Sequence, residues 1–279
     1  MNNNPKISIL ILNWNGMDII SNCLKSVDNI CYDNYSITVI DNGSTDGSID
    51  YIKKEFKNIA IFENNLNYGF SKGYNNYFNY NKDDDVDYYL ILNNDTIVDS
   101  NLLIQLVDAT DNYGTDNIYS PIIRNSDNTI WYAGGRLIKS LGITWHIGLG
   151  TTESCGLNKT KKTTYVSGCC MLIKREIINN LEGFNSLFNM YYEDVDLCLR
   201  AKKINIDCYV VENTYINHIV SHSLFNKGIF RKYILKTISL FKFIFLNNNI
   251  FISLISLLIN LILIPVTFSI YILKHIIKK

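Results

Sequence analysis

The stretch Tyr88-Tyr-Leu-Ile-Leu-Asn-Asn-Asp95 decides the fold class of this chain. A continuous apolar run of this length is typical of a parallel strand that is covered on both faces. Two amides and a carboxylate end the run, and the carboxyl ends of such strands are where open α/β sheets bind ligands. Hard oxygen atoms at that place suit a divalent cation that holds phosphate oxygens. A polar turn is the alternative, because Asn and Asp are common turn residues.

Segments with strand and helix patterns alternate before this run. We expect strands at residues 6–12, 36–40 and 59–63. We expect helices at residues 18–29, from the end of the turn-rich segment 41–47 to residue 56, and within residues 67–79. This alternation predicts an α/β fold with a doubly wound, mainly parallel sheet. After Asp95 the pattern loosens into mixed strands and loops, and we expect a strand at 166–174, a helix at 194–203 and a last strand at 208–211.

Composition excludes some classes of function. The net charge of the 279 residues is zero, so no nucleic-acid-binding surface is expected. The seven cysteines form no C-x-x-C pair and their number is odd, which argues against a zinc site or a disulfide framework. We expect them to be buried free thiols in a reducing compartment.

The C-terminus is unusually apolar. Residues 247–273 contain no charged residue and are long enough to cross a bilayer, although Asn260 and Pro265 interrupt them. Residues 227–242 alternate between basic and apolar, as an interfacial amphipathic helix would. A buried C-terminal helix is the alternative, but we expect membrane association. Spanning, re-entrant and flat arrangements stay open, because basic residues flank both ends.

Asp41 ends the second expected strand, where dinucleotide-binding folds place an acid on a ribose. The glycine fingerprint of those folds is missing after the first strand, which runs into Asn13-Trp14-Asn15-Gly16, so hydride transfer is not expected. A nucleotide could still bind here, with Trp14 against the base and Asp41 on the base or sugar. Asp41 and Asp46 could equally serve only as caps of the following helix.

The acids Glu193, Asp194 and Asp196 crowd the start of a predicted helix, beside aromatic residues. Acids in a first turn ordinarily interact with the helix dipole, and Asp196 with Arg200 forms a plausible i,i+4 pair. The same cluster is also a good place for a general base with a tuned pKa.

Two weaker signals remain. His218 and His222 follow the last expected strand; a histidine is more often structural, but imidazole can complete a metal shell made mainly of oxygen. Gly69 and Gly73 would let the backbone approach a ligand, or would only make a turn.

Taken in order, six segments resemble a family 2 glycosyltransferase with the GT-A fold, of the rhamnosyltransferase-like branch. They are SILILNWNG ending at Gly16, VIDNGSTDGS (39–48), NYGFSKGYNN (67–76), LILNNDT (90–96), VSGCCMLIKR (166–175) and YYEDVDLCLR (191–200). WYAGGR (131–136) and HIGLG (146–150) also resemble this branch. The resemblance covers residues 5 to 225 and implies a catalytic domain over 1–225. From their composition, residues 226–279 are expected to form amphipathic and hydrophobic membrane-associating helices.

The resemblance also implies roles for single residues. Asp194, with Glu193 beside it, matches the catalytic base, and Asp95 matches the metal ligand, with His218 joining it. The donor-binding residues would be Asn13, Trp14, Asn15, Asp41, Gly69, Lys72, Asn94 and Asp95, and the acceptor side would include Ser167, Gly168 and Tyr192. Asn93 replaces an acid that many relatives carry, so Asp95 would be the only carboxylate that this strand gives the metal. Lys72 and Tyr74 depart from the smaller residues common in the glycine loop.

The implied activity is inverting, metal-dependent transfer of a sugar from a nucleotide-sugar donor to a saccharide or lipid-linked saccharide acceptor. Mg²⁺ or Mn²⁺ would be the cofactor, dTDP-rhamnose the first donor to consider and a UDP-hexose the second. The setting would be cell-surface glycan assembly at the cytoplasmic face of a membrane. A sugar nucleotidyltransferase is one alternative, although residues 13–16 offer no glycine- and basic-rich loop for a triphosphate. A catalytically inactive membrane-bound assembly subunit is the other.

Overall fold

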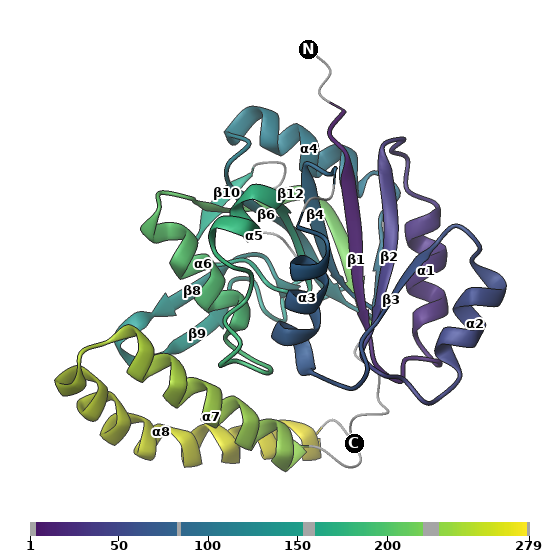
Figure 1. Cartoon of the computed structure of the whole chain (residues 1–279). Coiled ribbons are helices and arrows are strands. Elements are labelled where there is room, and N and C mark those ends of the chain that lie inside the picture. The colour runs from purple at the N-terminus through teal and green to yellow at the C-terminus, as the bar shows by residue number, and fades with distance from the viewer. Residues whose placement is uncertain (1–3, 83–84, 153–159, 220–228, 278–279) are drawn as a thin grey trace.

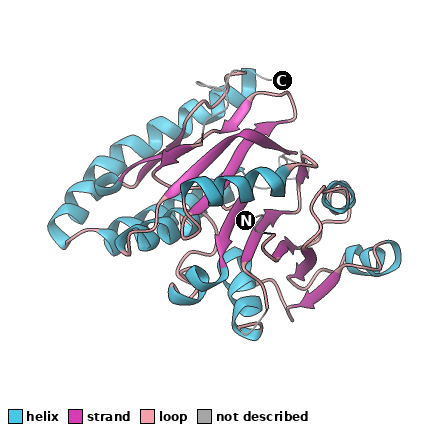
Figure 2. Cartoon of the chain, turned by 90° about the horizontal axis from the view of Figure 1, so that it is seen from above, coloured by secondary structure: helices cyan, strands magenta, loops and turns pink. Residues whose placement is uncertain are grey.

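Ten strands form one mixed sheet in the computed structural model, which describes residues 4–82, 85–152, 160–219 and 229–277. The strand order is β10-β12-β6-β11-β4-β1-β2-β3, with β5 attached to β12 and β7 to β6. Figure 2 shows helices flanking the strands on both sides. The fold is therefore α/β with a mainly parallel N-terminal part, as the sequence predicts.

Strands and helices alternate in the first part of the chain, as predicted from their periodicity. They are β1 (Ile7–Asn13), α1 (Ile20–Asp28), β2 (Tyr35–Asp41), α2 (Ser48–Glu55), β3 (Ala60–Glu63), α3 (Gly69–Tyr80) and β4 (Tyr88–Asn93). β1 pairs in parallel with both β2 and β4, and β2 pairs in parallel with β3.

The second part is mixed. It contains β5 (Thr96–Val98), α4 (Leu102–Tyr113), β6 (Ile118–Asn125), β7 (Ile130–Tyr132), β8 (Gly135–Ile138), the short helix η1 (Lys139–Leu141), β9 (Ile143–His146), β10 (Lys161–Thr163), β11 (Cys170–Lys174), α5 (Arg175–Asn180), α6 (Glu193–Lys203) and β12 (Cys208–His218). β11 lies antiparallel between β4 and β6, while β12 runs parallel to β6.

Two sequence-based boundaries differ from the structure. The strand expected from residue 166 begins at Cys170, because a turn precedes it: the Cys170 N–H bonds the Ser167 carbonyl oxygen. The last strand does not end at residue 211 but continues to His218 after an irregularity in its pairing with β6. Helix α4 was not predicted, although Leu102, Leu103 and Leu106 have helical spacing and are buried. Of the described cysteines, Cys31 is exposed and five are buried.

The C-terminal helices α7 (Ile229–Asn247) and α8 (Ile250–Ile277) form a hairpin. Both helices contact η1, at the tip of the β8–β9 hairpin, and Figure 1 shows them side by side below the rest of the described chain. Asn249 immediately precedes α8, and its side-chain oxygen accepts a hydrogen bond from the Ile252 N–H in the first turn. Among the described residues, no helix has both the length and the apolar character that a membrane crossing requires.

The decisive run forms the centre of the core. Leu90, Ile91 and Leu92 of β4 are fully buried between β1 and β11. Close packing of this kind leaves little room for relaxation when a side chain is shortened.

We therefore expect Leu90→Ala to lower the free energy of unfolding by about 2–5 kcal/mol. Leu149, whose exposed fraction is 59%, provides the matched control. Leu149→Ala should stay within about 0.5 kcal/mol of the parent protein. Guanidinium chloride unfolding followed by circular dichroism measures both changes, and equal losses in the two variants would contradict this account of the core.

Candidate functional site

The carboxyl ends of three parallel strands meet at one edge of the sheet. In the register of these strands, Asn13 is paired with Asp41, and Leu12 is paired with Asn93. The polar residues that end β1, β2 and β4 are therefore neighbours, as predicted for a ligand site of an open α/β sheet.

Two loops at this edge are joined by side-chain hydrogen bonds. The Asn15 side-chain oxygen accepts from the Thr45 N–H at 2.8 Å, and the Asn15 N–H donates to the Ser44 hydroxyl at 2.9 Å. Asp46 accepts from the Met17 and Ser48 N–H groups. Burial alone would raise the pKa of Asp46, but these hydrogen bonds lower it below its ordinary value. Asp46 therefore acts as a structural anchor of the edge.

Asp41 ends β2 at this edge and is 4% exposed. Its two carboxylate oxygens accept hydrogen bonds from Ser44, one from the hydroxyl at 2.5 Å and one from the N–H at 2.9 Å. Asp41 thus closes a local turn, whereas the alternative expected from the sequence was a cap of the following helix. Trp14 follows the end of β1 with 53% of its surface exposed, so its ring is accessible to a ligand.

Asn94 is tied to the end of β1. Its amide donates to the Asn13 side-chain oxygen at 2.9 Å, while Asn13 donates to the Ser48 hydroxyl at 3.1 Å. A Cβ on Gly16 would lie 2.2 Å from that Asn13 oxygen, so only glycine fits next to this pair. The packing fixes the direction in which residues 93–95 leave the sheet.

Asp95 and His218 form the pair that could hold a metal ion. The pairing of β5 with β12 places His218 opposite Thr96, and His218 Nε2 lies 3.1 Å from Asp95 Oδ2. Asp95 Oδ1 and His218 Nδ1 are both buried and have no hydrogen-bond partner among the described residues. Buried polar atoms are normally satisfied, so the unpaired Asp95 oxygen fits a bound ion.

The chemistry of this pair fits a divalent cation that also takes ligands from elsewhere. A carboxylate with an imidazole suits Mn²⁺ and is also compatible with Mg²⁺. Within the described chain, no group of three His, Cys, Asp or Glu side chains could hold a metal. His222 lies outside the described residues.

The ring of Trp131 packs against His218. The His218 ring lies 5.0 Å from the ring of Trp131, which in turn lies 4.6 Å from the ring of His146. His146 Nδ1 is 2.9 Å from the Trp131 carbonyl oxygen, and burial lowers the pKa of His146 to about 4. The sequence motifs that contain Trp131 and His146 were noticed, but no contact with His218 was predicted from them.

Asp194 lies in the first turn of α6, where Tyr192 precedes the helix in a left-handed conformation with φ 69°. One Asp194 oxygen accepts from the Gly168 N–H at 3.0 Å and the other from the Val195 N–H at 2.8 Å. Burial raises the pKa of Asp194 above its ordinary value despite these hydrogen bonds. Burial, and then the charge of Asp194, raise the pKa of the adjacent Glu193 well above its usual range.

The turn of residues 167–169 connects Asp194 with the end of β4. Gly168 donates to Asp194, and the Cys169 carbonyl oxygen accepts from the Asn93 N–H at 2.9 Å. The Ser167 hydroxyl supports the turn by accepting from the Cys169 N–H. The expected acceptor-side residues Ser167 and Gly168 thus lie between the candidate base and the strand that precedes Asp95.

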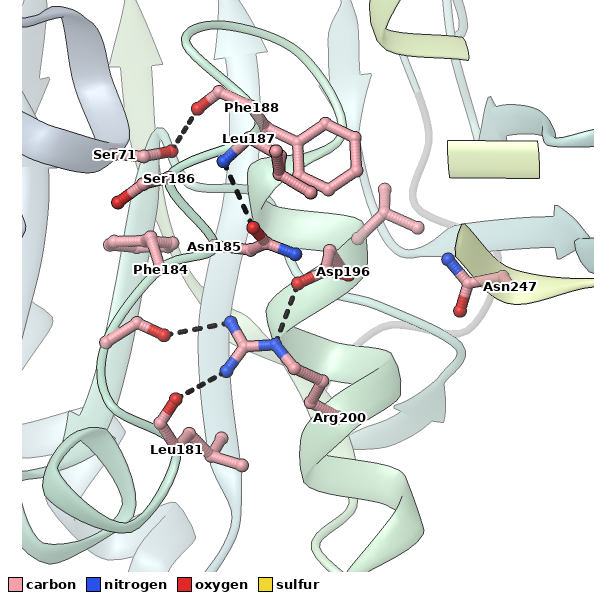
Figure 3. Close-up of polar contacts among 12 residues, drawn as sticks. Ser71, Leu181, Phe184, Asn185, Ser186, Leu187, Phe188, Asp196, Arg200 and Asn247 are labelled. Carbon is pink, nitrogen blue, oxygen red and sulfur yellow. Dashed lines mark hydrogen bonds and ion pairs between the residues drawn. The ribbon is translucent and has the colours of Figure 1, made fainter. Parts of the chain in front are cut away.

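The loop of residues 181–192 forms another wall of this region and is held from two sides (Figure 3). The Ser71 hydroxyl donates to the Phe188 carbonyl oxygen at 2.5 Å. Arg200 pairs with Asp196 at 2.7 Å and donates to the carbonyl oxygens of Leu181 and Gly183, so the predicted i,i+4 pair also supports the loop.

The glycine segment also meets this loop. Gly69 begins α3 with φ +77°, its carbonyl oxygen accepts from the Asn42 amide, and the next N–H bonds the Asn189 carbonyl oxygen. A Cβ on Gly73 would lie 2.9 Å from the Asn42 side chain, so this glycine permits close packing of α3. Lys72 lines a separate polar cavity of about 930 Å³, together with Asn75 and Arg200.

Comparison with known proteins gives the same family as the motifs. The model of glycosyl transferase family 2 matches residues 8–182. A low-salt glycan biosynthesis hexosyltransferase, Agl10, of Haloferax volcanii is 26% identical over 74% of this chain and 66% of its own length. An N-acetylglucosaminyl-diphospho-decaprenol L-rhamnosyltransferase of Mycobacterium tuberculosis is 24% identical over 67% of each chain.

Solved structures support the fold. The crystal structure of GalNAc-T7 with UDP, GalNAc and Mn²⁺ matches with a TM-score of 0.63 and 17% identity, over 78% of this chain and 44% of that one. The chain thus spans about two thirds of the length of the curated relatives and less than half of this structural neighbour. The family model covers most of the described sheet, and the chain therefore belongs to glycosyl transferase family 2.

Proposed function

We propose that this chain is an inverting, metal-dependent glycosyltransferase that uses Asp194 as its general base. The proposal is carried by one observation: the Asp95–His218 pair and Asp194 lie at the same edge of the sheet. The buried Asp95–His218 pair has unsatisfied polar atoms, and the 167–169 turn connects the strand before Asp95 to Asp194. The family membership supports transfer of a sugar as the reaction type.

Asp95 and His218 would hold Mn²⁺ or Mg²⁺. When bound, the cation would supply charge stabilisation for the diphosphate of the donor. Trp14, which is exposed, would stack on the nucleoside, and Asp41 would contact the base or sugar after exchanging a Ser44 hydrogen bond for the ligand. Asn13, Asn15 and Asn94 would maintain the shape of the donor site through the hydrogen bonds described above.

Asp194 would take the proton of an acceptor hydroxyl as that oxygen attacks the anomeric carbon. The new carbon–oxygen bond would form as the bond to the diphosphate breaks, so the nucleoside diphosphate leaves and the configuration inverts. The raised pKa of Asp194 favours this role, because a base is most effective when its pKa approaches the working pH. Ser167, Gly168 and Tyr192 would border the acceptor.

The donor is proposed to be dTDP-rhamnose or a UDP-hexose, and the acceptor a saccharide or lipid-linked saccharide of a cell-surface glycan. The curated relatives' names, a hexosyltransferase and an L-rhamnosyltransferase that acts on a diphospho-decaprenol, support these classes. We place the reaction at the cytoplasmic face of a membrane, with residues 226–279 as the associating part. Donor binding measured by thermal shift across a panel of nucleotide sugars with Mn²⁺ would select the donor.

Asp194→Asn should abolish transfer almost completely while donor binding is kept, because the amide cannot accept the acceptor's proton. General-base catalysis contributes about 10²–10⁴ in rate, so a loss of that size is expected in release of nucleoside diphosphate. Asp108→Asn, on the exposed side of α4, is the isosteric control and should retain activity. Normal turnover by the Asp194 variant, or loss of its donor-induced thermal shift, would overturn the assignment.

Glu193→Gln should retain most of the activity at neutral pH. Burial and the charge of Asp194 raise the pKa of Glu193 well above its usual range, which favours the neutral carboxyl, and glutamine resembles that neutral form. Asp194 must be deprotonated to act, so kcat/KM should increase with pH through its raised pKa and reach a plateau above it. A pH–rate profile of both proteins tests this, and loss of the acidic limb in Glu193→Gln would identify Glu193 as the titrating base.

His218→Ala should raise the Mn²⁺ concentration needed for donor binding by about tenfold or more, because it removes one of two protein ligands. The readout is the donor-induced thermal shift during Mn²⁺ titration, which does not depend on turnover. His146→Ala, which leaves the Asp95–His218 pair intact, is the comparison. An unchanged Mn²⁺ dependence in His218→Ala would contradict this metal site.

A further inference from the structure

The amphipathicity of α8 is reversed relative to a water-facing helix. Its buried stripe is polar: Ser253, Ser256 and Asn260 are at most 3% exposed. Ser256 donates to the Ser140 carbonyl oxygen at 2.5 Å, and Asn260 donates to the Leu141 carbonyl oxygen at 3.1 Å. Ser256 and Asn260 therefore hold η1 and are not available to water.

The opposite side of α8 is apolar and exposed. Its residues recur at helical spacing and will be called the outer face: Phe251, Leu254, Ile255, Leu258, Leu261 and Ile262. Leu258 is 64% and Ile262 is 71% exposed. Soluble monomers rarely expose a contiguous apolar surface of this kind, and such a surface marks a contact with a partner or a lipid phase.

The charges of α7 and α8 favour a lipid phase over a protein partner. The last acidic residue of the sequence is Glu212, so neither α7 nor α8 contains an acid. Helix α7 contributes the cations Arg231 and Lys232 at its start, whereas its Lys242 is bonded to the Leu187 carbonyl oxygen. An apolar helix face combined with cations and no acids matches the interface of an anionic bilayer, in which acyl chains lie below negatively charged headgroups.

We propose that the outer face of α8 lies in the interfacial layer of an anionic lipid bilayer, with α7 between this layer and the catalytic domain. What this docking means for the active site rests on the proposed function. It does not require a membrane crossing, because a helix lying in the interface buries only one face.

The hairpin directly supports the acceptor side of the site. The Ser239 hydroxyl of α7 donates to the Met190 carbonyl oxygen at 2.8 Å, and the Lys242 amine donates to the Leu187 carbonyl oxygen at 2.9 Å. The ring of Tyr192 packs 5.1 Å from the ring of Phe243, and its hydroxyl donates to the Gly142 carbonyl oxygen at 2.7 Å.

Tyr192 immediately precedes Glu193 and Asp194. A bilayer under α8 would therefore lie next to the loop that borders the catalytic base. The acceptor class that this arrangement fits is a saccharide on a lipid diphosphate, whose sugar stands at the headgroup level while its lipid stays in the bilayer.

Flotation of the full chain with lipid vesicles tests the docking. The protein should float with vesicles of phosphatidylcholine and phosphatidylglycerol in equal parts, and more weakly with phosphatidylcholine alone. Leu258→Ser/Ile262→Ser should lower the partition coefficient on mixed vesicles by about tenfold or more, because two apolar side chains leave the acyl boundary. Leu149→Ser/Ile204→Ser removes two residues that are 59% and 50% exposed elsewhere and should bind as the parent does.

Three results would overturn the proposal: no binding of the parent to either vesicle, equal binding of both double variants, or a parent dimer in light scattering that only the α8 variant dissociates. The last result would assign the outer face to a second copy of the chain. Circular dichroism confirms that the variants fold. The donor-induced thermal shift, measured without lipid, separates failure of this inference from failure of the proposed function, since it depends on the sheet edge and not on α8.

Discussion

The parallel pairing of β1 with β2 and β4 is the constraint on which the rest of the site depends. It places Asn13, Asp41 and Asn93 at one edge, and the buried run of β4 prevents any shift of register. A shift by one residue would turn every side chain of that strand to the other face. The backbone positions at which the following loops begin are therefore fixed, and these loops are held by the hydrogen bonds described above.

Two later strands, β11 and β12, complete the site that the parallel strands begin. β12 returns beside β5 and brings His218 next to Asp95, while the turn before β11 donates a backbone N–H to Asp194. The groups proposed to hold the metal and to accept the proton thus come from segments far apart in sequence, but each is attached to the same sheet. The C-terminal hairpin adds a further support through Tyr192, which is held by both α7 and the β8–β9 tip.

Much of the fold could be predicted from local patterns. The strand at Tyr88–Asn93 and the helix at Glu193–Lys203 were predicted within a residue or two, because apolar periodicity and first-turn acids are local signals. The pairing of His218 with Asp95 could be expected only from family resemblance, since a register across more than a hundred residues leaves no local trace. The support of Tyr192 by α7 was missed for the same reason. The C-terminal segment was predicted to associate with a membrane, but the polar stripe that α8 turns toward η1 became visible only in the packed structure.

The central claim is a single displacement in which Asp194 deprotonates the acceptor. Proton NMR of the sugar first released from a nucleotide-sugar donor, with Mn²⁺ present and water as the acceptor, tests it most directly. The account predicts that this sugar has the anomeric configuration opposite to that of the donor, before mutarotation mixes the two forms. A first-formed sugar with the donor's own configuration would contradict it.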